Sequence, residues 1–397
     1  MLVETCFVLS GEGSQWTGVK MANNSNASYF NGSSTIQPSQ PFLEGETWVD
    51  KFYIFLAVTE IIIVILALVF NSIVVYAFIA YKKLRTSATN YFVISLAISD
   101  LLTSGLVTTL KADAALKNQK WTHGEFMCNV YTTMYLLAVP STVINLCAFT
   151  VDRFLVLRMP LRYNSFMPPK RAAFIISCLW IYALTWACLP VMGWTAHPDN
   201  PVVQNGFCYF GTDRAYNITV NIVNFLLPMI FMAIFWSFIN SIVHQHRKRV
   251  LKIERSLSLN TNDSSNSSNN INANGEGHPM THLAPKNEKR ERKRIRRNVR
   301  GCRYLGFIVV LFYFCWLPYV TASMIGNLCT WCNAQGLIPY VLYDALLALG
   351  FMNSALNPFL YPFHDKHFKE AFRDMWKKIR SKIFVKLLSP KDEISRI

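Results

Sequence analysis

Long apolar stretches alternate with short polar segments along the whole chain. Crossing a bilayer as a helix takes about 20 residues. Stretches of at least this length lie near residues 53–80, 90–111, 128–151, 172–194, 217–240, 303–328 and 336–362. The last of them contains a single charged residue, Asp344. The pattern predicts an all-α fold, a seven-transmembrane helix bundle.

The composition supports a membrane protein over a soluble one. Apolar residues make up 52% of the chain and charged residues only 16%, whereas a soluble domain carries about a quarter charged residues. The charges gather in a few short segments. A soluble fold with two or three buried helices would leave most of this apolar surface uncovered.

The distribution of Lys and Arg predicts the orientation, because basic loops stay on the cytoplasmic side. Basic residues follow the first, third and fifth stretches, and the segment 327–336 has none. The amino terminus is therefore expected outside and the carboxyl terminus inside, in a multi-pass plasma-membrane protein. The net charge of +16 is then explained by basic segments beside the membrane, which the anionic lipid head groups of the bilayer attract. Nucleic acid is not an expected partner, since no soluble fold remains to bind it.

The segments outside the apolar stretches divide the chain further. Residues 1–50 are expected to form a disordered extracellular tail, and residues 51–363 the seven-helix domain. Within that domain, residues 250–295 are rich in Asn and Ser and predict a disordered intracellular loop. Residues 364–397 predict an amphipathic eighth helix on the inner membrane surface and a cytoplasmic tail. Glycosylation sequons in the first segment lie at Asn23, Asn26 and Asn31.

An acidic residue in the middle of an apolar stretch is costly and usually marks function. Asp100 is such a residue, and polar residues lie at a similar depth in other stretches: Asn71, Thr142, Asn353 and Asn357. These side chains either coordinate a small cation through oxygen atoms or hydrogen-bond one another.

Short motifs occur in order on all seven stretches. They are Asn71; Leu96 with Asp100; Asp152-Arg153-Phe154; Trp180; Pro228; Cys315-Trp316-Leu317-Pro318; and Asn357-Pro358-Phe359-Leu360-Tyr361. Together they resemble the rhodopsin-like (class A) G-protein-coupled receptors over the whole membrane domain. The resemblance implies a receptor and no enzymatic activity.

The resemblance also assigns roles to residues. It implies that Asp152 holds Arg153 until activation frees the arginine to meet a heterotrimeric G protein, which Pro160 and Leu161 would also contact. Arrestin is a further partner of such receptors. The resemblance implies an activation switch made of Trp316, Pro318, Phe312, Pro228, Asn357, Pro358 and Tyr361. It further implies an allosteric sodium site, with no other cofactor, at Asp100, Thr142, Asn353 and Asn357.

Two cysteine pairs lie in the predicted extracellular segments, where disulfides persist. The resemblance implies that Cys128 and Cys208 are bonded to each other. Cys329 and Cys332 would form a small second bridge, as in some amine and adenosine receptors. A zinc site is the alternative for this second pair, but it lacks two further ligands.

The sequence from 349 to 358 looks most like that of biogenic-amine receptors, but the amine-binding aspartate of those receptors is replaced by Tyr135. Their supporting tyrosine is replaced by Phe351. A desolvated amine without a counter-ion would lose several kcal/mol of binding energy. A neutral, hydrogen-bonding ligand site is therefore expected. Its predicted residues are Tyr135, Leu136, Val139, Val220, Asn221, Asn224, Trp316, Tyr319, Val320 and Phe351. The alternative is that these residues only pack between helices.

Other departures from the family bear on signalling. The seventh stretch has no lysine, so retinal cannot attach and the chain is not an opsin. Asn298 and Trp236 replace a locking glutamate and a supporting tyrosine, which suggests elevated basal activity. The expected function is transmission of an extracellular small-molecule signal to G proteins. One alternative is a receptor-like partner or scaffold that is non-signalling or constitutively active. A less favoured alternative is a multi-pass transporter, which would be expected to have internal repeats and several midplane charges.

Overall fold

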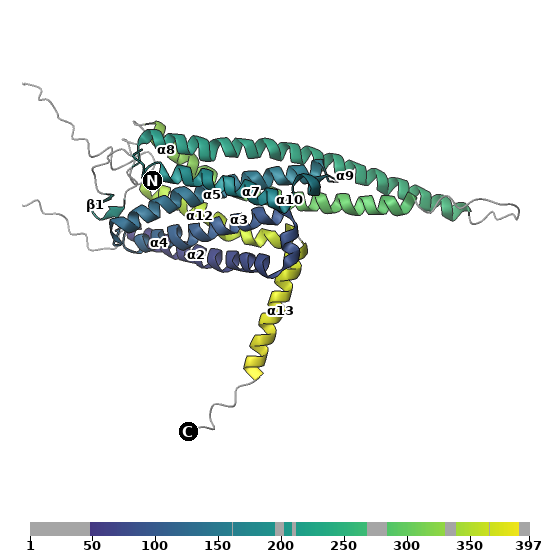
Figure 1. The fold of residues 1–397 in the computed structure, drawn as a ribbon, viewed down its shortest axis with the longest axis horizontal. Helices are drawn as coiled ribbons and strands as arrows, with labels where there is room; N and C mark the ends of the chain where they lie inside the picture. Colours follow the sequence, from purple (N-terminus) through teal and green to yellow (C-terminus); the bar gives the residue numbers. More distant parts are fainter. Residues whose placement is uncertain are drawn as a thin grey trace, which may run out of the picture.

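The structure is a computed structural model, and it describes residues 48–160, 162–194, 202–208, 212–267, 284–329, 339–364 and 366–388. These residues form an elongated helical bundle with one short hairpin at the end opposite α13 (Figure 1). The helices in chain order are α2 (Trp48–Ala80), η1 (Lys82–Thr86), α3 (Ala88–Leu102), η2 (Thr103–Thr108), α4 (Thr109–Leu116), α5 (Gly124–Arg158), α6 (Tyr163–Phe166), α7 (Pro169–Cys188), α8 (Arg214–Asn221), η3 (Ile222–Leu226), α9 (Leu227–Ser267), α10 (Ala284–Leu328), α12 (Tyr340–His364) and α13 (Lys366–Leu388).

Among the described residues, six helical segments are long and apolar enough to cross a membrane: Trp48–Ala80, Ala88–Leu116, Gly124–Arg158, Pro169–Cys188, Arg214–Lys252 and Gly306–Leu328. Helix α12 packs against α2 and α10 and supplies the last long helix of the bundle. Two of the segments pass through a π-helical turn, η2 and η3. The prediction of an all-α seven-helix bundle is confirmed.

The bundle exposes large apolar side chains on its outside. Phe55, Ile62, Val310 and Phe314 are among the most exposed of them. A soluble protein would not leave so many such side chains in water, whereas lipid tails solvate them. The outer surface therefore agrees with a membrane environment.

Polar side chains tie the helices together inside this apolar shell. Asn71 of α2 donates to the carbonyl oxygen of Ser354 on α12 at 3.0 Å. Trp180 of α7 donates to Ser95 of α3 at 3.0 Å, and Ser95 donates to Asn145 of α5 at 2.8 Å. Because hydrocarbon offers no partner, these bonds fix the register of neighbouring helices.

Helices α9 and α10 extend beyond the predicted membrane stretches and run side by side away from the bundle (Figure 1). The disordered loop predicted over residues 250–295 is thus helical up to Ser267 and again from Ala284. The sequence from 252 to 267 contains neither Gly nor Pro, the two residues that interrupt a helix most strongly. Residues 268–283 lie outside the described part.

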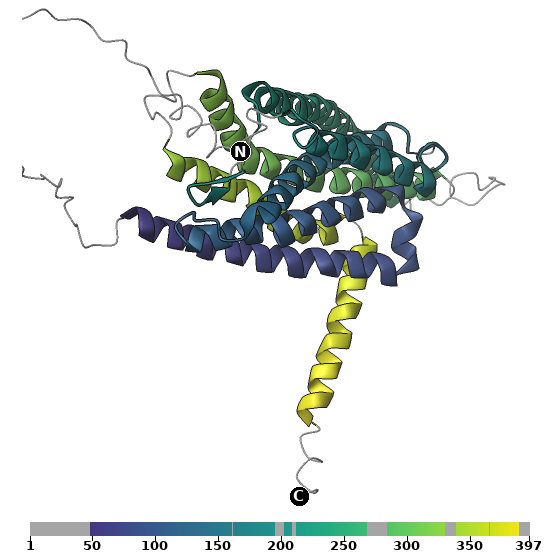
Figure 2. The same ribbon diagram turned by 60° about the vertical axis from the view of Figure 1, so that its left-hand side comes forward.

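Helix α13 leaves the end of α12 and projects sideways from the bundle in both views (Figures 1 and 2). Its first turns are anchored, because Phe368 and Ala371 are buried in the core of the bundle. Trp376 is exposed further along the helix. A helix anchored at one end and apolar on one face fits the predicted surface helix.

Candidate functional site

Aromatic residues from three helices meet in the half of the bundle near the β-hairpin. The hydroxyl groups of Tyr135 on α5 and Tyr319 on α10 are 3.0 Å apart. The Trp316 ring lies edge-on to the rings of Tyr319 and Phe351, with centroids 5.9 and 6.4 Å away. Phe351 also contacts Tyr135 edge-on at 6.5 Å. The structure thus brings the predicted ligand residues of α5, α10 and α12 into one cluster.

The remaining predicted ligand residues surround this cluster and are also buried: Leu136, Val139, Val220, Asn221, Asn224 and Val320. Asn221 donates to Ser323 at 3.1 Å, and Asn224 accepts a bond from Tyr182 at 2.9 Å. Within the described residues, Asn224 Nδ2 and Trp316 Nε1 are buried without a hydrogen-bond partner. These two donors are the groups of the cluster that a ligand oxygen would satisfy.

The side chains around Asp100 lie in the middle of the bundle. Asn357 donates to Asp100 Oδ2 at 3.0 Å, whereas Thr142 donates to Ser99 at 3.1 Å. Among the described atoms, Asp100 Oδ1 and the side-chain oxygens of Asn353 and Asn357 are buried without partners. Unpaired carboxylate and amide oxygens are the donor set that a small hard cation prefers. The residues present therefore fit a sodium ion.

The carboxyl-terminal end of α5 holds Arg153 in a closed arrangement. Arg153 Nε donates to Asp152 Oδ2 at 3.0 Å, and the guanidinium also contacts Thr89 of α3. Asp152 accepts a further bond from Thr89 at 2.9 Å and one from the hydroxyl of Tyr163 on α6. The Arg153 guanidinium lies 5.4 Å from the Phe149 ring. Arg153 is buried in this state and is not presented at the surface.

Tyr163 contributes to this closed state as a hydrogen-bond donor. Burial, together with the nearby Asp152 carboxylate, raises the pKa of the Tyr163 phenol. The phenol therefore stays protonated at neutral pH and keeps donating to Asp152. Sequence reasoning identified Asp152 and Arg153 but missed Thr89 and Tyr163, because neither carries a charge or a motif of its own.

Other predicted coupling and switch residues take varied positions. Phe312, Trp316, Asn357 and Pro358 are buried, Pro318 and Pro228 are half-buried, and Pro160 is exposed. Helix α10 continues through Pro318, and Pro228 lies in the first turn of α9 directly after η3. Leu161 and the side chains of Tyr361 and Asn298 lie outside the described part of the chain.

Trp236 of α9 packs against α10 at Gly306. A Cβ added to Gly306 would overlap the far edge of the Trp236 ring and lie 3.1 Å from Cζ3. Glycine at this position thus allows the large indole to lie between the two helices. Trp236, which departs from the family pattern, is accommodated because Gly306 opposite it has no side chain.

Gly306→Ala is therefore expected to destabilise the protein by about 1–3 kcal/mol, the usual cost of overpacking. The intrinsic helix preference of alanine recovers about 1 kcal/mol of this at most. The unfolding midpoint of the purified protein in lipid nanodiscs measures the effect. Trp236→Leu combined with Gly306→Ala should restore the midpoint, and an unrelieved loss in the double variant would contradict the steric explanation.

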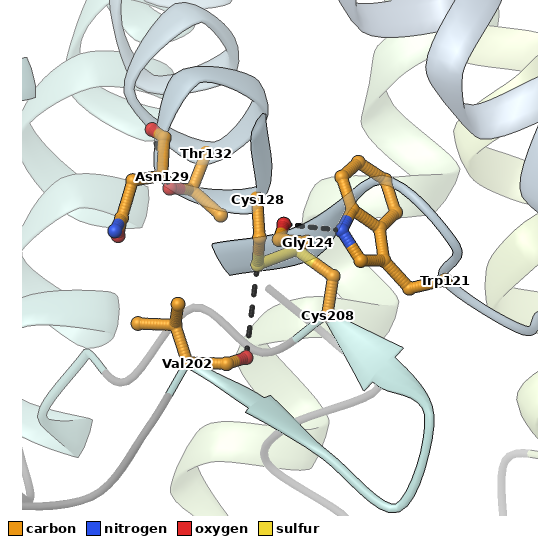
Figure 3. Close-up of a disulfide and its surroundings, with 7 residues drawn as sticks. All are labelled: Trp121, Gly124, Cys128, Asn129, Thr132, Val202 and Cys208. Atoms are coloured by element: carbon orange, nitrogen blue, oxygen red, sulfur yellow. Dashed lines mark hydrogen bonds between the residues drawn. A yellow bond between two sulfur atoms is a disulfide. The ribbon is translucent and has the colours of Figure 1, made fainter. Parts of the chain in front are cut away.

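The β-hairpin is fixed to the bundle by a disulfide (Figure 3). Strands β1 (Val203–Gln204) and β2 (Phe207–Cys208) pair antiparallel, and Cys208 is bonded to Cys128 in the second turn of α5. Trp121 lies beside this bond, donating through Nε1 to the Gly124 carbonyl at 2.9 Å and through its backbone amide to Gly206 at 2.7 Å. The predicted Cys128–Cys208 bridge is confirmed.

Some other residues predicted to lie outside the cell fall partly or wholly beyond the described residues. Cys329 is disulfide-bonded, but Cys332 lies outside the described residues. The sequons at Asn23, Asn26 and Asn31 also lie outside them. Their glycosylation stays a prediction.

Comparison with known proteins agrees with these motifs and their geometry. The chain is 28% identical to 5-hydroxytryptamine receptor 4 of Rattus norvegicus over 321 residues, which are 78% of this chain and 73% of the relative. It is 27% identical to octopamine receptor beta-2R of Chilo suppressalis over 323 residues, 79% of this chain and 77% of the relative. Residues 70–361 match the family described as 7 transmembrane receptor (rhodopsin family). The chain is a multi-pass membrane protein and belongs to this family of G-protein-coupled receptors.

Proposed function

We propose that this receptor transmits an extracellular small-molecule signal across the plasma membrane to heterotrimeric G proteins. The arrangement of Arg153 is the observation that carries the proposal. Asp152 and Thr89 contact the arginine directly, and Asp152 is itself held by bonds from Thr89 and Tyr163. Releasing Arg153 from these partners would present a cation at the cytoplasmic surface.

The aromatic cluster supplies the other end of the signal path. Trp316 and Tyr319 belong to α10, whose Pro318 has no backbone N–H to donate to the preceding turn. A ligand that binds one arrangement of this cluster more tightly shifts the population toward it. The outward swing of the cytoplasmic half of α10 would then expose Arg153.

The ligand is proposed to be a small molecule that contacts the aromatic cluster. The two relatives are receptors for 5-hydroxytryptamine and octopamine by name, and both of these compounds are amines. In this chain Tyr135 stands at the place of the amine-binding aspartate, and its hydroxyl is bonded to Tyr319. An amine held by a carboxylate on α5 is therefore not proposed.

A cation site around Asp100 is proposed to favour the closed state. The unpaired oxygens of Asp100, Asn353 and Asn357 support it. A bound sodium ion would supply a positive charge that neutralises the buried carboxylate. The residues themselves link α3 to α12, so loss of the ion would loosen that contact.

The alternative function is a receptor-like partner or scaffold that does not signal by itself. The variant Arg153→Ala distinguishes a signalling receptor from a non-signalling partner or scaffold. Cells expressing the wild type are expected to activate a G protein above the level of empty cells, either without ligand or with a hit from a small-molecule screen. Arg153→Ala at equal surface expression should lose at least tenfold of that signal. Equal signals from both forms would contradict coupling through Arg153.

A further inference from the structure

Pro318 divides the described membrane part of α10 into two segments, the inner half (residues 306–317) and the outer half (residues 319–328). Proline has no backbone N–H, so one hydrogen bond of the helix is missing here and the two halves can tilt against each other. The halves differ in their polar contacts with neighbouring helices. This difference identifies the half that is fixed and the half that can move.

The outer half is bonded to α8 at two levels. Asn221 of α8 donates to the Ser323 hydroxyl at 3.1 Å. Further out, Arg214 Nε of α8 donates to the backbone oxygen of Asn327 at 2.6 Å. That oxygen lies in the last turn of α10, where backbone oxygens lack a partner within the helix. The guanidinium group bonds the free oxygen and offsets the negative end of the helix dipole.

The outer half is also bonded to α5 and α12. The hydroxyl groups of Tyr319 and Tyr135 of α5 are 3.0 Å apart. The Tyr343 hydroxyl of α12 donates to the backbone oxygen of Ala322 at 2.9 Å. Because the lipid interior offers no replacement partner, bonds to three helices hold this half of α10 in place.

The inner half has fewer polar contacts with its neighbours. Among the described side chains of residues 306–317, one is hydrogen-bonded to another helix: the Tyr313 hydroxyl donates to the backbone oxygen of Met229 on α9. Gly306 adds a close packing contact with Trp236 of α9. The inner half is therefore held to α9 by one hydrogen bond and by apolar packing.

The turn of α9 that accepts this bond is itself supported. It follows the π-helical turn η3 and contains Pro228. Cys147 of α5 donates through its thiol to the Pro228 backbone oxygen at 3.6 Å. Two consecutive backbone oxygens thus accept side-chain bonds from the neighbouring helices α5 and α10, which is possible because a carbonyl oxygen has two lone pairs. Tyr313 therefore binds a part of α9 that α5 holds in place.

The position of Tyr313 makes its bond sensitive to a tilt of the inner half. The residue lies five positions before Pro318, which is about 7–8 Å along the helix. A tilt of about 10° at Pro318 would therefore move Tyr313 away from α9 by about 1.3 Å. Such a shift exceeds what an O–H···O bond of about 2.5–3.0 Å tolerates. The bond is present only while the inner half lies against α9.

We propose that the Tyr313 hydroxyl and the Met229 backbone oxygen form a latch that holds the inner half of α10 against α9 in the closed state. The latch opens when the inner half tilts about Pro318, while the outer half stays in place. The proposal rests on the proposed function, since it concerns the same movement of α10. It adds Tyr313 to the switch as a positioning residue.

The test measures the movement without ligand or G protein. Full-length receptor in lipid nanodiscs carries spin labels on Arg85→Cys of η1, which is exposed, and on Arg297→Cys of α10, in a background with Cys178→Ser and Cys302→Ser. The distribution of label distances gives the ratio of open to closed populations. Tyr313→Phe keeps the ring and removes the donor. We expect the ratio to rise about three- to tenfold, which corresponds to about 0.6–1.4 kcal/mol, the size of an interhelical hydrogen bond in a membrane.

Tyr343→Phe is the matched control. It removes the same kind of bond, from a tyrosine hydroxyl to a backbone oxygen of α10, on the other side of Pro318. It should leave the ratio within twofold of the wild type. All variants are also measured with Asp152→Asn, which favours the open state by removing the charge that holds Arg153. Because Tyr313 and Asp152 act through different bonds on different helices, the two effects should multiply.

The latch is overturned if Tyr313→Phe leaves the ratio unchanged in both backgrounds, or if Tyr343→Phe raises it equally. Failure of Tyr313→Phe to fold would show that the bond is needed in every state, which also overturns a latch that opens. Nucleotide exchange on G proteins, measured on the same samples, judges the proposed function separately. A higher open population without faster exchange supports the latch and contradicts coupling. Faster exchange at an unchanged ratio overturns the latch and supports coupling.

Discussion

Asp152→Asn is expected to raise ligand-free G-protein activation about tenfold or more. The carboxylate accepts bonds from Arg153 at 3.0 Å and from Thr89 at 2.9 Å, and a third from Tyr163. An amide keeps the shape but loses the charge and one acceptor atom. A hydrogen bond to a charged group contributes about 1.5–3 kcal/mol, and about 1.4 kcal/mol changes an equilibrium tenfold. The closed state is thereby destabilised relative to the open one.

A second-messenger assay without ligand, normalised to surface expression, measures this effect. Asp152→Asn combined with Arg153→Ala is the matched control, because it removes the lock together with the group that the lock holds. The double variant should be silent. Basal signalling of Asp152→Asn at the wild-type level would show that the bonds around Arg153 do not restrain activation.

Cys208→Ser is expected to destabilise the folded receptor by about 2–5 kcal/mol, the usual consequence of removing a native disulfide. The bond joins residues 80 apart and attaches the β-hairpin to the start of α5. Its loss would free the hairpin and the adjacent Trp121, whose backbone amide bonds to Gly206. Less receptor should reach the cell surface, and the unfolding midpoint of the purified protein should fall.

Cys178→Ser controls for the substitution itself. Cys178 is a free, exposed cysteine on α7, so its replacement should change neither surface expression nor the midpoint. Cys128→Ser combined with Cys208→Ser should behave like either single variant, since one bond is lost in each. Equal midpoints for Cys208→Ser and the wild type would contradict a stabilising role for the bridge.

The sequence was sufficient to predict the bundle and the residues of its motifs. The length of each apolar stretch and the charge of each loop depend only on local sequence, so the membrane-spanning helices could be predicted without knowledge of the contacts between them. The bridge between Cys128 and Cys208 and the pairing of Asp152 with Arg153 followed from resemblance, and both are present in the structure. The sequence did not predict the extension of α9 and α10, because a polar composition indicates disorder, although residues 252–267 contain neither Gly nor Pro.

The buried charged residues Glu60 and Lys111 were missed for a different reason. Glu60 and Lys111 both lie inside apolar stretches, which is itself a signal of function, but the sequence singled out Asp100 alone at the midplane. Whether such residues meet depends on how each helix is rotated about its axis and on their relative depths. Only the packed bundle shows that Lys111 of α4 and Asp344 of α12 form a buried ion pair, with Nζ and Oδ1 2.6 Å apart, and that Glu60 of α2 is fully buried.

Nucleotide exchange on purified G proteins tests the central claim most directly. Receptor in lipid nanodiscs is mixed with each of a panel of heterotrimeric G proteins, and binding of a non-hydrolysable GTP analogue is followed over time. At least one G protein should exchange faster with Asp152→Asn than with empty nanodiscs, and Arg153→Ala should abolish the acceleration. Rates equal to those of empty nanodiscs for the wild type, for Asp152→Asn and for every G protein in the panel would contradict the proposed function.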